Sequence, residues 1–302
     1  MCDSRADNHS SPKQSVSSWL RPAYQGSRKI ELMQIGELTK AGHRAIHLDG
    51  VFNMRDIGGL QTSTGRAVRK GLLYRADALS WISESDIHRI RDDLGISLIL
   101  DLRLPKETER ARSPLFRSQS GAATSAPLVS YVNISFRCTD DPAEDVVTVI
   151  ALSRQLSDGY KMYVQHSAAR IARAVQVLAE PGSLPAIIHC SGGKDRTGVL
   201  LAIILDAIGI EHAQIIDDYA ATDERMPLLM SRVSGENAYE GHRVTQLPGW
   251  AFRAMPATME DFLSYMCNTH GGSYAWLHKQ GVHSEVLDGL RERFLSRADC
   301  PS

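Results

Sequence analysis

One stretch near the middle of the chain limits the folds that this sequence can adopt. Residues 184–189 are β-rich and lead directly into a loop that contains Gly192 and Gly193, and an apolar helix follows the loop. A buried strand that passes through a short loop into a helix is the repeating unit of α/β proteins with parallel sheets. The rest of the chain must then supply strands to pair with this one and helices to cover both faces of the sheet.

Helical and β-rich patterns alternate along the chain as this unit requires. The predicted strands are 96–102, 131–136 and 184–189, and the predicted helices are 160–179, 259–266 and 286–294. Ser83 and Asp86 form the pattern of a capping box, which predicts the start of a further helix that contains Ile87, Ile90 and Leu94. This order predicts an α/β fold with a central, mostly parallel sheet flanked by helices.

The chain is expected to consist of a short leader and one domain. Residues 1–28 are polar and Ser-rich, so they are predicted to be poorly ordered. Residues 29–302 are predicted to form a single domain. Within it, residues 221–255 are an insertion with two open interpretations: a helical lid that excludes water from a reacting site, or a small helical cover over the core.

Charge and cysteine content exclude several classes of protein. The 302 residues carry 34 Lys and Arg against 35 Asp and Glu, a formal net charge of −1, so no nucleic acid partner is expected. The most apolar stretch, 199–208, is about half the ~20 residues that cross a bilayer, so no integral membrane segment is expected. The five cysteines lack the spacing of a disulfide framework or a zinc module. The sequence favours a reduced, cytoplasmic location, with secretion without a signal peptide left open.

The loop between the predicted strand 184–189 and the helix that follows carries the candidate chemistry. Cys190 and Arg196 are separated by five residues, so the loop can wrap until its N–H groups and the positive end of the helix converge on one point. Such a cradle fits a phosphate dianion and favours a nucleophilic thiolate at Cys190. Arg196 offers a planar fork for phosphoryl oxygens. This chemistry needs no metal or other cofactor.

A nucleotide-binding interpretation of the same loop fails on spacing. The G-x4-G-K-[ST] pattern of nucleotide-binding loops is absent, and Lys194 is followed by Asp195 rather than by a serine or threonine. The backbone freedom of Gly192 and Gly193 is instead expected to serve the tight turn.

The string from His189 to Gly198 resembles the signature of the protein tyrosine phosphatase superfamily. Its ending is similar to that of bacterial and fungal tyrosine and phosphoinositide phosphatases with an HCxxGKDRTG loop. Other stretches typical of that family occur in the same order, and the resemblance covers about residues 44–296. These stretches are 53–59, 73–79, 101–103 with Glu107, 256–259 and 271–272. The resemblance implies a phosphatase-like α/β fold.

The resemblance also implies a role for each residue of the loop. Cys190 would form a phosphocysteine and Arg196 would clamp the phosphate. Lys194 would be an extra cation facing the substrate, Thr197 would place a hydroxyl near the sulfur, and His189 would brace the loop. The residues expected to bind substrate are Ser191, Gly192, Gly193, Lys194, Thr197 and Gly198.

Two of the stretches outside the loop are interpreted as supports rather than catalysts. Arg55, Asp56 and Gly58 are expected to organise a turn and an ion pair beneath the site. Asp101 and Arg103 are expected to end a central strand near the loop.

The sequence offers several candidates for the general acid that protonates the leaving group, because no clear Trp-Pro-Asp precedes the cysteine. Asp195, within the loop and beside Arg196, is favoured. Asp140 and Asp141 follow the predicted strand 131–136 and are the main alternatives. Asp158 has suitable linear spacing from Cys190 but is expected to cap a helix.

Taken as a whole, the sequence predicts a cysteine-dependent, metal-independent phosphomonoester hydrolase of the tyrosine or dual-specificity kind. Phosphotyrosine in proteins is the favoured substrate, with phosphoinositides and phosphoserine or phosphothreonine as further candidates. A sulfurtransferase and a catalytically inactive phosphate-binding module are the alternatives. The physiological substrate and the oligomeric state are left open.

Overall fold

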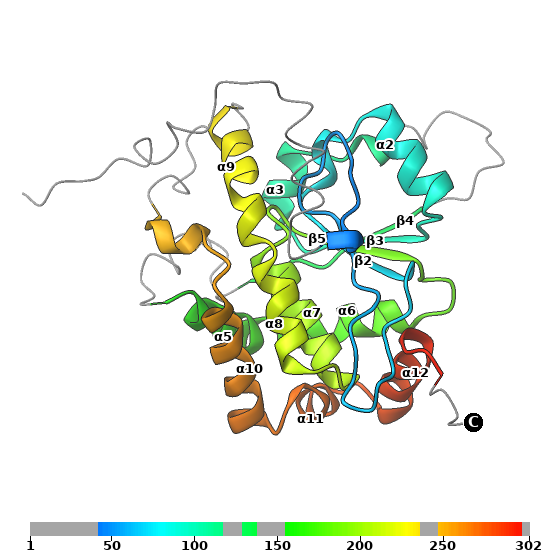
Figure 1. Cartoon of the computed structure of the whole chain (residues 1–302), viewed down its shortest axis with the longest axis vertical. Helices are drawn as coiled ribbons and strands as arrows, with labels where there is room; N and C mark the ends of the chain where they lie inside the picture. Colours follow the sequence, from blue (N-terminus) through cyan, green and yellow to red (C-terminus); the bar gives the residue numbers. More distant parts are fainter. Residues whose placement is uncertain (1–41, 117–128, 138–154, 236–246, 298–302) are drawn as a thin grey trace, which may run out of the picture.

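A five-stranded sheet forms the middle of the described structure. The computed structural model describes residues 42–116, 129–137, 155–235 and 247–297 (Figure 1). The strands are β1 (Arg55–Asp56), β2 (Leu73–Ala76), β3 (Leu98–Asp101), β4 (Ser130–Asn133) and β5 (Ala186–His189). Their spatial order is β1-β2-β5-β3-β4; β1 pairs with β2 in antiparallel fashion, and the other three pairings are parallel. The predicted α/β fold with a mostly parallel sheet is confirmed.

Helices cover both faces of this sheet, with α2 on one side and α6, α7 and α12 on the other (Figure 1). The helices are α2 (Glu84–His88), α3 (Pro105–Arg110), α5 (Leu156–His166), α6 (Ala168–Ala179), α7 (Asp195–Ala207), α8 (His212–Ala220), α9 (Met226–Gly235), α10 (Pro256–His270), α11 (Ser273–Lys279) and α12 (Ser284–Phe294). Within the described residues, no helix is long and apolar enough to span a membrane.

The side chains of β3 and β5 alternate between two cores, one on each face of the sheet. Ile188 and Leu100 join the larger core beneath α6 and α7, whereas Ile187 and Ile99 join the smaller core near α2. Every residue of β2, β3 and β5 is buried, as expected for parallel strands covered on both faces. β5 lies at the centre, so the loop that follows it leaves from the middle of the sheet.

The sequence patterns predict where helices and strands occur more accurately than they predict where each one begins and ends. The capping box is confirmed: the Ser83 hydroxyl accepts from the Asp86 N–H at 3.2 Å, and the Asp86 carboxylate accepts from the Ser83 N–H at 3.0 Å. After α2 the chain continues into a turn of π-helix over Arg89–Asp93. The three predicted strands exist and each is shorter than predicted: β3 at both ends, β4 at its C-terminal end and β5 at its N-terminal end, because ladder pairing covers less than the apolar pattern.

The single helix predicted for 160–179 is wrong, because the structure has two helices that meet at Ser167. The Ser167 hydroxyl accepts from the backbone N–H of Arg137 at 2.7 Å and donates to the carbonyl of the same residue at 2.8 Å. Its backbone leaves the helical region, with φ −120° and ψ 19°. A side chain that bonds a distant backbone segment competes with helix continuation, which apolar periodicity cannot reveal.

An arginine of α9 links the described part of the predicted insertion 221–255 to residues near the start of the described chain. The Arg232 guanidinium lies over the rings of Phe52 and Trp81, 4.0 and 4.8 Å from their centroids. It also forms a 3.0 Å ion pair with the buried carboxylate of Asp77. The predicted leader 1–28 lies outside the described residues, and the lid and cover interpretations of the insertion stay open.

The Ser167 contact predicts a measurable loss of stability on removal of one hydroxyl. Ser167→Ala leaves the N–H and carbonyl of Arg137 without this partner, so the free energy of unfolding in urea should fall by about 1–3 kcal/mol. Ser264→Ala, at an exposed position of α10, is the matched control and should change it by less than about 0.5 kcal/mol. Equal stability of the two variants would contradict the role given to Ser167.

Candidate active site

The loop 190–194 connects the central strand β5 to α7. Cys190 follows the last strand residue directly and is 3% exposed. Arg196 lies in the first turn of α7 and is buried. The structure therefore brings the predicted nucleophile and the predicted phosphate clamp to the carboxyl edge of the sheet, at the positive end of a helix.

The carbonyl groups of three consecutive loop residues are bonded to elements outside the loop. The Ser191 carbonyl accepts from the N–H of Ala78 at 3.0 Å, and the Gly192 carbonyl accepts from the Asn53 amide at 3.0 Å. The Gly193 carbonyl accepts from Arg75 at 2.6 Å. In each peptide unit the N–H points opposite to the carbonyl, so the N–H groups of 192–194 point toward the inside of the loop. This orientation of the N–H groups fits the anion cradle that the sequence predicts.

Gly193 is required for this arrangement on two grounds. Its φ of +65° lies in the left-handed region, and a Cβ atom at this position would lie 2.4 Å from the Ala76 carbonyl oxygen. The loop thus contacts the end of β2 so closely that no side chain fits. The backbone freedom predicted at Gly193 is confirmed, whereas Gly192 has neither a left-handed φ nor a close contact that would exclude a side chain.

Three arginines beneath the loop converge on the buried carboxylate of Asp218 in α8. Arg75, Arg44 and Arg55 lie 2.6, 2.8 and 3.1 Å from its oxygens. Burial opposes ionisation of Asp218, but Arg55, Arg75 and Arg44 together hold its pKa far below the ordinary range. Burial lowers the pKa of Arg55 to about 9, which leaves it charged at neutral pH. The predicted ion pair beneath the site exists, and its acidic partner is Asp218.

The neighbouring Asp56 performs the other predicted support role. Its two carboxylate oxygens accept from the backbone N–H groups of Gly58 at 2.7 Å and Gly71 at 2.8 Å. These bonds fix the turn after β1, as the sequence predicts.

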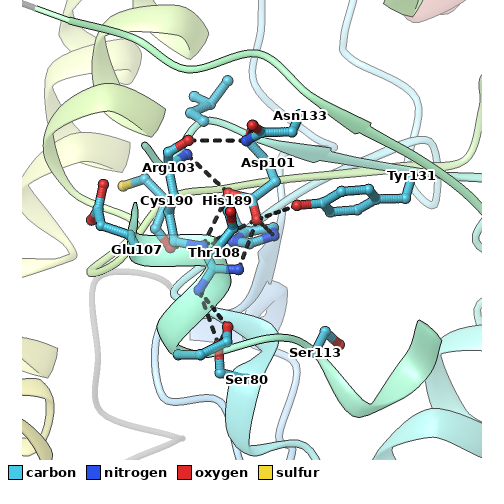
Figure 2. Close-up of polar contacts among 12 residues, drawn as sticks. Ser80, Asp101, Arg103, Glu107, Thr108, Ser113, Tyr131, Asn133, His189 and Cys190 are labelled. Atoms are coloured by element: carbon cyan, nitrogen blue, oxygen red, sulfur yellow. Dashed lines mark hydrogen bonds and ion pairs between the residues drawn. The ribbon is translucent and has the colours of Figure 1, made fainter. Parts of the chain in front are cut away.

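Glu107 of α3 holds the guanidinium of Arg196. Its two oxygens lie 2.6 and 2.9 Å from the two terminal nitrogens, and the Ser191 hydroxyl also donates to it at 2.5 Å. Burial alone would raise the pKa of Glu107, but Arg196 and its hydrogen bonds outweigh burial and bring that pKa to about 2. In Figure 2 the Glu107 carboxylate and the Cys190 sulfur extend to the same side. In the sequence Glu107 is recognisable only as part of a motif, and no role is predicted for it.

A second buried network braces the loop from behind (Figure 2). Arg103 donates to the Asp101 carboxylate at 2.7 and 3.1 Å, and the Tyr131 hydroxyl donates to it at 2.9 Å. The His189 ring connects this network to the loop: one ring nitrogen lies 3.6 Å from the Asp101 carboxylate, and the other lies 3.2 Å from the Cys190 carbonyl. Burial lowers the pKa of His189, so the ring is neutral near pH 7. This arrangement suits the bracing role predicted for His189.

Lys194 contacts the insertion. It is 3% exposed, and its ammonium donates to the Ala251 carbonyl and, at 3.3 Å, to the Arg253 carbonyl. It also lies 3.5 Å from the Asp195 carboxylate. The ammonium is thus bound to the segment 251–253, and a role facing the substrate stays a prediction.

The last two residues of the signature lie in the first turn of α7. Thr197 is fully buried, and its hydroxyl has no hydrogen-bond partner among the described residues; that this hydroxyl serves the Cys190 sulfur stays a prediction. Gly198 packs against the ring of Tyr219, which would lie 3.1 Å from a Cβ at this position. Its small size therefore serves packing of α8 on α7.

The candidate general acids are separated by the structure. Asp195 is the first residue of α7, with its side chain 30% exposed, and its Oδ1 accepts from the Tyr160 hydroxyl at 2.8 Å. Asp158 does not cap α5 as expected: the cap residue is Gln155, and Asp158 lies in the first turn, 3.7 Å from Lys161. Asp140 and Asp141 lie outside the described residues. The choice of Asp195 stays a prediction.

Two further features of the described residues bear on metals and thiols. No group of three or more His, Cys, Asp or Glu side chains there is arranged to hold a metal ion. Cys190 and Cys267 are both free thiols, the first buried and the second exposed.

Comparison with known proteins places residues 46–296 on the model of the tyrosine phosphatase family. The triple specificity protein phosphatase PtpB of Mycobacterium tuberculosis is 28% identical over 210 residues, 62% of this chain and 72% of that protein. A tyrosine-protein phosphatase of Nostoc commune is 27% identical over 231 residues, 72% of this chain and 74% of that protein. Among solved structures, the core catalytic domain of the PP-IP phosphatase SIW14 from S. cerevisiae is 15% identical, covers 68% of this chain and 97% of that one, and has a TM-score of 0.34.

The Glu107 ion pair predicts a specific dependence of stability on pH. Because the folded pKa, about 2, is below the ordinary value of 4.5, the pair stabilises the fold fully above pH 4.5. That contribution is lost as the pH falls toward 2. The difference in free energy of unfolding between wild type and Glu107→Gln should therefore be constant near neutral pH and shrink as the pH falls below 4.5.

Urea unfolding at a series of pH values measures this difference. Glu109→Gln, an exposed position on the same helix, is the control and should follow the wild type at every pH. A Glu107→Gln difference that does not change with pH would show that the carboxylate charge does not stabilise the fold.

Proposed function

The chain belongs to the tyrosine phosphatase family and is a phosphatase, and we propose that it hydrolyses phosphomonoesters in two steps through a phosphocysteine at Cys190. One observation carries this proposal. Cys190 lies at the floor of a loop whose carbonyls are bonded outward, with Arg196 in the following helix turn. A thiolate there faces a ring of N–H donors suited to a phosphoryl group.

In the first step, the Cys190 sulfur attacks phosphorus, and the bond from phosphorus to the substrate oxygen breaks. The leaving oxygen takes a proton from Asp195, which is within the loop region and partly exposed. In the second step a water oxygen attacks phosphorus and gives a proton back to Asp195. The sulfur–phosphorus bond breaks, which releases inorganic phosphate and regenerates the thiolate.

Arg196 supplies the charge that stabilises both steps. Its guanidinium is held in plane by the two oxygens of Glu107, so it is oriented before substrate arrives. A preoriented cation costs little reorganisation when negative charge develops on the phosphoryl oxygens. Glu107 is therefore a positioning residue for Arg196.

We infer phosphotyrosine in proteins as the first substrate class, with phosphoinositides and phosphoserine or phosphothreonine as further classes. The names of the relatives support this range, since one is a tyrosine-protein phosphatase and another a triple specificity phosphatase. Membership of the phosphatase family argues against the sulfurtransferase alternative. The inactive-module alternative is tested by turnover itself.

The phosphocysteine mechanism predicts a complete dependence of activity on one thiol. Cys190→Ser should lower the turnover of para-nitrophenyl phosphate by at least about 10³-fold, because the hydroxyl is a far weaker nucleophile. EDTA should leave wild-type turnover unchanged. Acid quenching of the wild type during turnover should trap phosphate on the peptide that contains Cys190, detectable by mass spectrometry.

Cys267→Ser is the control, because it removes the other free thiol of the described residues at an exposed position, and it should retain full activity. Equal turnover rates for the wild type and Cys190→Ser would rule out the phosphocysteine mechanism. Inhibition by EDTA would show that a metal takes part.

The assignment of Asp195 predicts a dependence on the leaving group. Asp195→Asn should slow hydrolysis of phenyl phosphate by about 10²-fold, and hydrolysis of para-nitrophenyl phosphate much less, because nitrophenolate leaves without a proton. Asp158→Asn, a surface carboxylate paired with Lys161, should match the wild type on both esters. If Asp195→Asn keeps full turnover of phenyl phosphate, the acid is another residue, with Asp140 and Asp141 the next to test.

A further inference from the structure

A pair of buried tyrosine hydroxyls ends on the carboxylate of Asp195. Tyr160 of α5 is 1% exposed, and its hydroxyl lies 2.8 Å from Asp195 Oδ1 and 2.7 Å from the hydroxyl of Tyr219 in α8. The Tyr160 ring makes edge contacts with the rings of Tyr219 and Phe262. Three helices thus fix the position of one phenol oxygen beside the loop.

The direction of these hydrogen bonds follows from the groups involved. An ionised carboxylate only accepts, so the Tyr160 hydroxyl donates to Asp195 and must accept from Tyr219. Burial, together with the nearby Asp195 carboxylate, raises the pKa of both tyrosines well above 10. Both phenols therefore keep their protons at neutral pH. The donor to Oδ1 stays in place whether Asp195 is ionised or protonated.

The two oxygens of Asp195 differ in their surroundings. Among the described residues, both polar contacts of this carboxylate fall on Oδ1: the Tyr160 hydroxyl at 2.8 Å and the Lys194 ammonium at 3.5 Å. Two donors on one oxygen disfavour a proton there. Oδ2 is then the oxygen that can carry a proton.

The packing around the two phenols also indicates that their hydroxyls serve Asp195. Both belong to the large core, where phenylalanine would fill the same space without burying a hydroxyl. Gly198, in the first turn of α7, leaves the room that the Tyr219 ring occupies. The two hydroxyls form a hydrogen bond with each other, and the Tyr160 hydroxyl also bonds one charged group, the Asp195 carboxylate.

We propose that Tyr160 is a positioning residue that holds Asp195 by Oδ1, so that Oδ2 delivers the proton to the leaving group and later accepts one from water. This inference rests on the proposed function, with Asp195 as general acid. Tyr160 neither gains nor loses a proton over the cycle. Tyr219 supports it by donating to the Tyr160 oxygen.

The test is Tyr160→Phe, which removes the hydroxyl and keeps the ring contacts. With the hydrogen bond gone, the carboxyl group of Asp195 can rotate, so kcat for phenyl phosphate should fall about tenfold. The kcat for para-nitrophenyl phosphate, whose leaving group needs no proton, should change less than about twofold. KM should stay the same for both esters, because the phosphate cradle is intact.

Tyr219→Phe should lower kcat for phenyl phosphate in the same direction by a smaller factor, because it removes only the outer donor. Tyr265→Phe is the matched control, since its hydroxyl contacts His270 and should not affect either ester. Urea unfolding checks that each variant is folded. If Tyr160→Phe does not fold, the leaving-group dependence of Tyr219→Phe decides the question.

The outcomes separate this inference from the proposed function. If Cys190→Ser retains turnover, the proposed function fails. If Cys190→Ser and Asp195→Asn behave as expected but Tyr160→Phe lowers kcat equally for both esters, or for neither, the function stands and the positioning role is wrong. A loss confined to phenyl phosphate supports the role.

Discussion

The attraction between the Asp218 carboxylate and three arginines is the contact on which the geometry of the site depends. Arg75 is held by Asp218 at 2.6 Å and in turn donates to the Gly193 carbonyl at 2.6 Å. One charged group in α8 therefore determines where a carbonyl of the loop points. A buried ion pair that loses one partner leaves an uncompensated charge, at a cost of about 3–5 kcal/mol. Without Asp218, three guanidiniums would remain close together beneath the loop.

The same cluster explains how a chain with nearly balanced charges holds an anion. Three guanidiniums against one carboxylate leave a local excess of positive charge, although the whole chain has a formal net charge of −1. The positive end of α7 adds to it. Arg196 is paired with the Glu107 carboxylate, so these two residues add no net charge to this excess. The buried cluster beneath the loop therefore contributes to a field that favours an anion, and low internal polarity makes that contribution stronger than the same charges would give at the surface.

The sequence predicted those parts of the site that are contiguous and missed those assembled from distant segments. The strand, loop and helix from 184 onward are contiguous, so the spacing of Cys190 and Arg196, the glycines between them and the flanking elements predict this part of the site. Asp218 of α8 acts on the loop through Arg75, and Tyr160 of α5 contacts Asp195, and both residues fit ordinary helix patterns. Asp218 is 143 residues from Arg75, and no local pattern records a contact over such a separation. The break at Ser167 was missed for the same reason, since its partner is 30 residues away.

Lys194 connects the insertion to the chemistry. Its ammonium is bound to carbonyls of the segment 251–253, whereas the resemblance places a cation at this position toward the substrate. The lysine side chain is long and flexible, but its ammonium cannot bind the carbonyls of 251–253 and face the substrate at the same time. Moving toward a bound phosphate would break the bonds to Ala251 and Arg253 and leave their carbonyls in need of other donors. If Lys194 does turn toward substrate, as the resemblance implies, substrate binding would be linked to the placement of this part of the insertion through one residue.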